Sequence, residues 1–83
     1  MSDSWSSEVY ISWIRSEYDN ICSDDYELCN YLVSLVGEVL DKWYNDELHQ
    51  MYEEYRYGCV HDEILLKILL DKTIECLNNI DHQ

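Results

Sequence analysis

The sequence contains no proline and only two glycines among its 83 residues. These residue types mark most turns and hairpins, so their scarcity favours helices joined by short connections over a fold of short strands. A chain of this length forms one domain and buries only about 60% of the surface that its unfolded form exposes. We therefore expect residues 1–83 to form a single all-α domain, a compact three- to four-helix bundle.

Basic residues are also scarce, since five Lys and Arg face eighteen Asp and Glu, for a formal net charge of -13. Such a charge disfavours direct binding to nucleic acid or to an anionic membrane, and it steers a basic protein partner toward the surface. The hydrophobic fraction of 47%, with eight tyrosines and three tryptophans, excludes an intrinsically disordered acidic tail. The chain is expected to fold and to bind a basic partner.

Long apolar segments and a secretory leader pattern are missing as well. The longest apolar stretches are interrupted by Glu38 or Lys67, and the first residues contain neither a basic region nor an apolar core. These features predict a cytoplasmic protein. In that compartment the cysteines are expected to be reduced, most often as buried thiols: Cys22, Cys29, Cys59 and Cys76.

Helical periodicity predicts a first helix over about residues 4–21, with Ser4 or Ser7 as its N-cap. A second helix is expected to begin at Ser23 or Asp24, where Asp24 and Glu27 have the spacing of a capping box. Its interior glycine, Gly37, indicates either a close helix crossing or a tolerated defect. The apolar stripe of the first helix contains Tyr10, Ile14, Tyr18 and Ile21. The apolar stripe of the second helix contains Leu28, Leu32, Leu35, Val36, Val39 and Trp43.

A third, short helix is expected after Asn45 or Asp46, with Gly58 in a left-handed conformation at its end. A fourth helix is expected from His61 or Asp62 to about residue 80. We predict that its inner surface contains Ile64, Leu65, Ile68, Leu69, Thr73, Cys76 and Ile80, and that a second apolar stripe contains Leu66, Leu70, Ile74 and Leu77. The second stripe is consistent with a homodimer through this helix and equally with a monomer.

The acids recur as doublets at residues 24–25, 46–47, 53–54 and 62–63. Three of these lie at predicted helix starts, where carboxylates are stabilised by free amides and by the helix dipole. Glu53 and Glu54 lie instead in the later half of a helix, where the dipole disfavours them. We expect Arg56 to pair with Glu53 and Lys42 with Glu38. Four acids then have no local cation: Glu17, Asp19, Asp41 and Glu54.

Carboxylates one helical turn apart are separated by about 5.4 Å along the axis, and DNA presents a phosphate every ~3.4 Å per strand. Helical acids can therefore imitate a phosphate row, while interleaved tyrosines add rigid area for stacking on arginine. The candidate partner-binding residues are Glu17, Asp19, Asp41, Asp46, Glu47, Tyr52, Glu53, Glu54 and Tyr57. The alternative is that Tyr52 and Tyr55 belong to the core and that the acids form only a solvated face.

No motif for catalysis or cofactor binding is evident. Cys59 and His61, with His49 and Cys29, lack the paired spacing of structural zinc sites. Cys59 and His61 also lack an orienting residue for a thiolate–imidazole pair, and the isolated glycines form no phosphate-binding loop. We therefore expect a protein that is not an enzyme, without catalytic residues, metal or cofactor.

In size, acidity, helical content and interleaving of tyrosines with acids, as in residues 52–57, the chain resembles the short phage-encoded DNA mimics that block restriction enzymes or CRISPR effectors. The resemblance covers the whole chain in character, without a motif that maps residue by residue. It implies an inhibitor, acting in the cytoplasm of a bacterial host cell, that occupies the basic nucleic-acid channel of its target. It favours an anti-CRISPR protein over an inhibitor of restriction.

Two other functions fit the sequence. An immunity protein or antitoxin that neutralises a basic nuclease would have nearly the same acidic and aromatic surface. A helical adaptor subunit would instead join an assembly through an apolar face, with its charge serving only solubility.

Overall fold

The computed structural model describes residues 6–22, 24–58 and 62–80. In these ranges the chain forms four helices and no strand: α1 (Ser7–Tyr18), α2 (Tyr26–Lys42), α3 (Asp46–Tyr57) and α4 (Glu63–Ile80). The prediction of an all-α bundle is therefore confirmed. No helix in the described part of the chain is long and apolar enough to cross a membrane.

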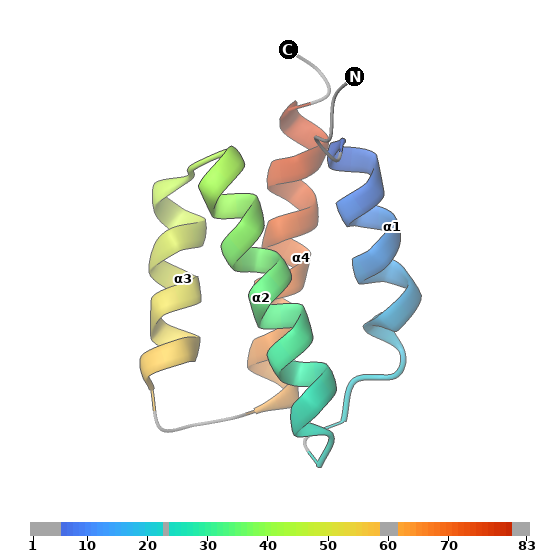
Figure 1. The fold of residues 1–83 in the computed structure, drawn as a ribbon. Coiled ribbons are helices and arrows are strands. Elements are labelled where there is room, and N and C mark those ends of the chain that lie inside the picture. Colours follow the sequence, from blue (N-terminus) through green and yellow to red (C-terminus); the bar gives the residue numbers. More distant parts are fainter. Residues whose placement is uncertain (1–5, 23, 59–61, 81–83) are drawn as a thin grey trace.

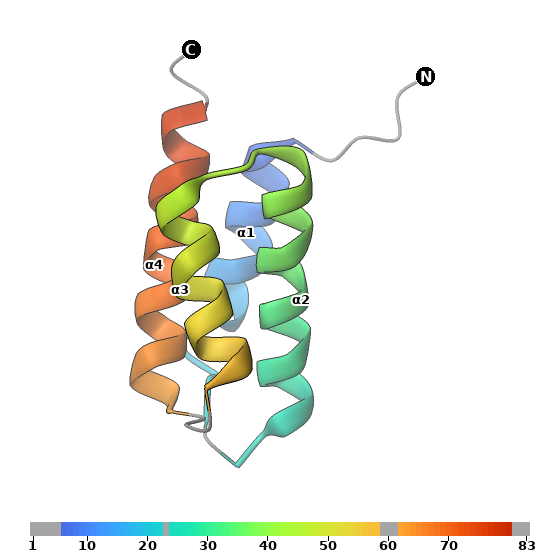
Figure 2. The same cartoon turned by 90° about the vertical axis from the view of Figure 1, so that its left-hand side faces the viewer.

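Each helix runs antiparallel to the one before it, so the chain goes up and down the bundle (Figure 1). Helices α2 and α4 each contact all three other helices, whereas α1 and α3 do not contact each other. The cross-section is therefore a diamond, with α2 and α4 on its short diagonal and α1 and α3 on opposite flanks. Figure 2 looks onto the α3 flank and shows α3 between α4 and α2.

The core is built around α4, which contributes fully buried leucines. Tyr10 and Ile14 of α1, together with Leu48 of α3, are buried against them from the two flanks. Tyr10 makes edge-to-face contacts with Trp13 at 5.6 Å and with Trp43 at 6.0 Å between ring centroids, which close one end of the core. The buried apolar side chains of the two central helices are Cys29, Leu32, Leu35, Val36, Val39, Leu40, Leu66, Leu69, Leu70 and Leu77.

The predicted orientation of α4 is wrong for part of its surface. Leu66, Leu70 and Leu77, predicted to form a second stripe, are fully buried inside the single chain. Ile64, Leu65 and Ile68, predicted to face the core, are exposed, while Leu69 and Thr73 are buried as expected. Because α4 contacts three helices through its leucine face, that stripe is covered within one molecule and is not available for the homodimer that it suggested.

The starts of the first two helices differ from the prediction by one or two residues. Ser6, and not Ser7, is the N-cap of α1, and its side chain makes no capping hydrogen bond; Ser4 lies outside the described residues. Asp25, and not Asp24, caps α2 by accepting a hydrogen bond from the Leu28 amide at 3.0 Å. The Asp24–Glu27 capping box is therefore absent, and Ile21 is buried after the end of α1.

The later caps agree better with the sequence. Asn45 caps α3 through a 3.0 Å hydrogen bond from the Leu48 amide, and Asp62 accepts one from the Ile64 amide at 2.9 Å. Gly58 ends α3 in extended conformation, with φ -75° and ψ 158°, so the predicted left-handed residue is wrong. A Cβ atom at this glycine would lie 2.5 Å from the Glu54 carbonyl oxygen, which explains the glycine by steric crowding.

Gly37 lies where α3 packs onto α2. A Cβ atom at this position would lie 3.1 Å from the hydroxyl oxygen of Tyr52 and 3.6 Å from its Cζ atom. The glycine thus makes room for the end of the Tyr52 side chain, and the close crossing of helix backbones expected at this position stays a prediction.

Candidate partner-binding surface

The outer face of α3 carries two pairs of exposed carboxylates. Asp46 and Glu47 lie in its first turn, and Glu53 and Glu54 lie seven residues later. Seven residues are two helical turns, or about 10.5 Å along the axis. The first pair also stabilises the helix start through the dipole, whereas the second pair gains nothing from it. We call these four residues the α3 acidic face.

The two tyrosines predicted to bind the partner, Tyr52 and Tyr57, lie beside this face and differ in burial. Tyr52 is half-buried against Gly37, and its hydroxyl accepts a hydrogen bond from Arg56. Tyr57 is exposed, and the Arg56 guanidinium lies 5.7 Å from the Tyr52 ring centroid and 5.8 Å from that of Tyr57. Tyr55 is buried in the core. The alternative that assigned tyrosines to packing is thus correct for Tyr55 and partly correct for Tyr52.

Asp41 joins this region from α2. It lies on a shallow hollow of about 390 Å³ between α2 and α3, which Glu38, His49 and the cation Arg56 also line. His49 approaches Glu53 at 3.6 Å, an ion pair only when the imidazole is protonated. Seven of the nine predicted residues therefore lie on α3 or beside it: Asp41, Asp46, Glu47, Tyr52, Glu53, Glu54 and Tyr57.

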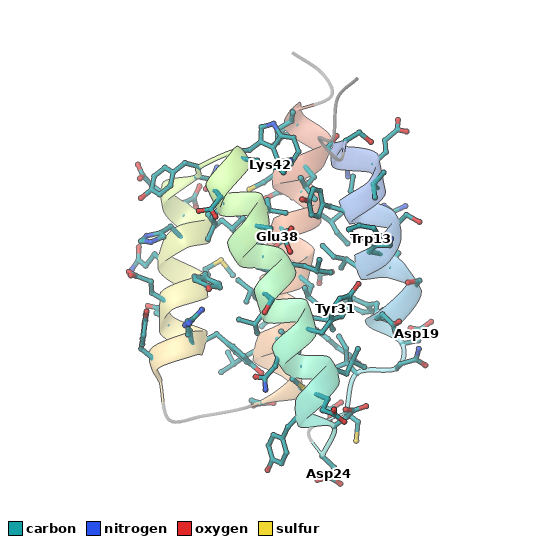
Figure 3. All side chains as sticks on the ribbon, viewed as in Figure 1. Trp13, Asp19, Asp24, Tyr31, Glu38 and Lys42 are labelled. Atoms are coloured by element: carbon teal, nitrogen blue, oxygen red, sulfur yellow. The ribbon has the colours of Figure 1, made fainter. Side chains whose placement is uncertain are left out.

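Glu17 and Asp19 lie elsewhere, at the end of α1. Figure 3 shows Asp19 at the lower end of α1, on the opposite flank from α3. The Glu17 carboxylate accepts a hydrogen bond from Asn20 at 3.1 Å, and Asp19 lines a hollow with Arg15 and Asp71. Because α1 and α3 do not touch, the structure separates these two acids from the other seven candidates.

Most of these carboxylates are in no ion pair within the part of the chain that the structure describes. Lys42, Arg56 and Lys67 each lie over an aromatic ring, at 5.6 to 6.0 Å from its centroid. Lys72 pairs with Glu75 at 3.0 Å and with Glu47 at 3.6 Å. Such cation–π contacts are worth about 0.5–1 kcal/mol at exposed sites, and they place positive charge on rings instead of on acids.

The local ion pairs expected from helical spacing do not form. Arg56 donates to Tyr52 instead of pairing with Glu53, and Glu38 accepts a 3.4 Å hydrogen bond from the Tyr10 hydroxyl instead of pairing with Lys42. Figure 3 shows Glu38 and Lys42 on α2. Among the ion pairs of the described residues, none includes the four acids expected to lack a cation: Glu17, Asp19, Asp41 and Glu54.

Titrating groups near these acids respond to the negative field. The pKa of Tyr44 is raised by its hydrogen bond to Asp46, by partial desolvation and by the charges of Asp46 and Glu53. The pKa of Tyr18 is raised by desolvation and by Asp71, to which its hydroxyl donates at 3.3 Å. The Tyr44 shift reflects the negative charge of Asp46 and Glu53, whereas Tyr18 lies on the α1 flank, away from the α3 acidic face.

An apolar groove next to the α3 acidic face was not foreseen. It lies between α3 and α4, measures about 260 Å³, and is lined by Met51, Glu54, Tyr55, Leu65, Ile68 and Leu69. We call it the α3–α4 groove. Its sequence signal is that α4 has two apolar stripes: Leu65 and Ile68 of the stripe expected in the core line the groove, and the stripe expected at a dimer interface is largely in the core.

The thiols and carboxylates form no recognisable chemical centre in residues 6–22, 24–58 and 62–80. No group of three or more His, Cys, Asp or Glu side chains is placed to hold a metal ion there. Cys22, Cys29 and Cys76 are free thiols, and burial raises the pKa of both Cys29 and Cys76, which lowers their reactivity at neutral pH. Cys59 and His61 lie outside the described residues.

The chain matches no protein-family model, no curated protein and no solved structure.

Proposed function

We propose that this chain is a phage-encoded inhibitor that binds the basic nucleic-acid-binding surface of a host defence nuclease complex, with a CRISPR effector as the preferred target. In this anti-CRISPR role it acts as a DNA mimic. The observation that carries the proposal is the α3 acidic face, four exposed carboxylates of which Glu47 alone pairs with a lysine or arginine among the described residues.

The spacing of this face suits a groove made for phosphates. Its two carboxylate pairs are about 10.5 Å apart along the helix, close to the rise of three base steps at ~3.4 Å each. Asp41 extends the acidic area across the hollow toward α2. A rigid helix presents these charges without the ordering cost that a flexible acidic peptide would incur on binding.

The energetics also agree with competition against DNA. A channel lined by Lys and Arg binds a polyanion largely through charge, and a matching protein surface can replace the phosphates there. The net charge of -13 adds long-range attraction that raises the association rate. Exposed Tyr57 beside the acids supplies area for stacking on an arginine of the target.

The test compares two variants with the same change of net charge. Glu53→Lys with Glu54→Lys alters the later half of α3, and Glu17→Lys with Asp19→Lys alters the end of α1. Each protein is titrated into purified CRISPR effector complexes and restriction enzymes bound to fluorescent target DNA, and DNA release is followed by anisotropy. The wild type is expected to release DNA from a CRISPR effector, and the α3 variant to lose at least tenfold in potency.

The α1 variant is the control and is expected to lose much less, because it changes only the overall field. Equal losses in both variants would show that net charge alone acts, against a placed mimic. Binding to a nuclease without release of its DNA would favour the immunity-protein alternative, and the absence of any effect on DNA binding across these targets would refute the mimic.

A further inference from the structure

The α3–α4 groove combines apolar walls with the Glu54 carboxylate, which is in no ion pair of the described residues. Leu65 is 44% exposed and Ile68 is 48% exposed on its α4 side, and neighbouring Ile64 is 63% exposed. Isolated apolar side chains on a surface are ordinary. These three are adjacent on one helical face and lie beside a concave groove, so together they offer a place for another apolar side chain.

One charged side chain, that of Glu54, is among the residues that line the groove. Glu54 lines its α3 wall and is exposed. Lys67, which precedes Ile68 on α4, lies over the Tyr18 ring of α1 and so is directed toward another helix. Farther along the same seam, Lys72 is already paired with Glu47 and Glu75. The edge of the groove therefore favours a cation beside an apolar group.

A second copy of the chain fits this groove poorly. A symmetric contact would bring two molecules of net charge -13 together, with both α3 acidic faces close to the interface. Three partly exposed aliphatic side chains also supply only a fraction of the ~800 Å² per partner that a stable interface buries. With a basic partner, the surrounding acids contribute attraction and additional buried area.

We propose that the α3–α4 groove receives the apolar face of a basic amphipathic helix of the target protein, whose Lys or Arg side chains reach Glu54. This inference rests on the proposed function, because it assigns the apolar part of the same basic partner. It places an apolar anchor next to the charged contacts, and such anchors usually determine which of several basic surfaces is bound.

The test uses two synthetic peptides of identical leucine and lysine composition. In one peptide the leucines recur at helical spacing on one face, and in the other the same residues are scrambled. Binding of each fluorescent peptide is measured by anisotropy at low and high salt. The wild type is expected to bind the amphipathic peptide about tenfold more tightly than the scrambled one, since one buried aliphatic side chain accounts for such a factor.

Leu65→Ser and Ile68→Ser are each expected to remove this preference and to leave binding of the scrambled peptide unchanged. Both side chains are partly exposed, so the fold is expected to persist, which circular dichroism checks. Tyr31→Ser is the matched control, because Tyr31 is similarly exposed, at 45%, and does not line the groove. It is expected to bind both peptides as the wild type does.

The outcomes separate the two proposals. Equal, salt-sensitive binding of both peptides by the wild type and by Ile68→Ser would overturn the groove and leave the acidic surface standing. Absence of binding to either peptide at low salt would refute the polycation-binding surface itself. Sedimentation velocity tests the remaining alternative, a homodimer formed through the groove. If the wild type is a dimer and Ile68→Ser is a monomer, the groove binds a second copy of the chain.

Discussion

Gly37 and Tyr52 oppose each other at the contact between α2 and α3. Alanine in a helix interior is about 1 kcal/mol more favourable than glycine, but a Cβ atom at position 37 would lie 3.1 Å from the Tyr52 hydroxyl oxygen. We expect Gly37→Ala alone to change the free energy of unfolding little, because the shift of Tyr52 offsets the gain. With Tyr52→Phe in place, Gly37→Ala is expected to stabilise by about 1 kcal/mol.

Urea denaturation of the wild type, both single variants and the double variant measures this difference as a coupling energy. Tyr52→Phe also supplies the control, because it removes the hydroxyl that accepts from Arg56 and retains the ring. If Gly37→Ala has the same effect in both backgrounds, the hydroxyl does not limit the approach of the two helices.

At the scale of a helix, the N-caps show which polar side chains stabilise the helix starts. Asn45 accepts a 3.0 Å hydrogen bond from the Leu48 amide, whereas the Ser6 side chain makes no such bond at the start of α1. Asn45→Ala is therefore expected to lower the free energy of unfolding by about 1 kcal/mol. Ser6→Ala is the matched control and is expected to change it by less than about half as much. The free energy of unfolding is measured by urea denaturation, followed by circular dichroism at 222 nm. Similar losses of this free energy in both variants would contradict the assignment of the cap to Asn45.

The helices themselves could be predicted from sequence because apolar spacing, the absence of proline and cap residues all favour the same elements. The orientation of α4 about its own axis could not be predicted from the sequence. Both of its stripes are apolar, so periodicity does not say which one faces the core, and only the placement of three neighbouring helices buries Leu66 and Leu70 and leaves Ile64 and Ile68 exposed. Cap positions were similarly ambiguous where Asp24 and Asp25, or consecutive serines, compete for one role.

The candidate surface was predictable in composition and not in layout. The acids of α3 share an exposed side of the helix because residues seven apart lie on one face. It did not reveal that Asp41 lies next to them or that Glu17 and Asp19 lie on the far flank, because those relations depend on the diamond arrangement of the helices. The ion pairs failed for a related reason: nearby rings compete for the same cations.

For the whole molecule, the same charge acts in two opposing ways. A net charge of -13 on one small bundle repels itself and weakens the fold, while it attracts a basic partner. Added salt shortens the Debye length from about 10 Å at 0.1 M to about 3 Å at 1 M and screens both interactions. We therefore expect sodium chloride to raise the urea midpoint of the isolated protein while it weakens binding to a lysine-rich peptide.

A variant with Glu17→Gln, Asp41→Asn and Glu54→Gln tests whether repulsion is the cause, because none of these acids is in an ion pair within the described helices and loops. Its fold is expected to be more stable than the wild type at 0.05 M salt and to gain less from added salt, since less repulsion remains to be screened. Its affinity for the peptide is expected to fall, with a shallower dependence on salt. A salt-induced gain in stability as large as that of the wild type would mean that salt acts through general effects on burial, and that the acidic surface costs the fold little.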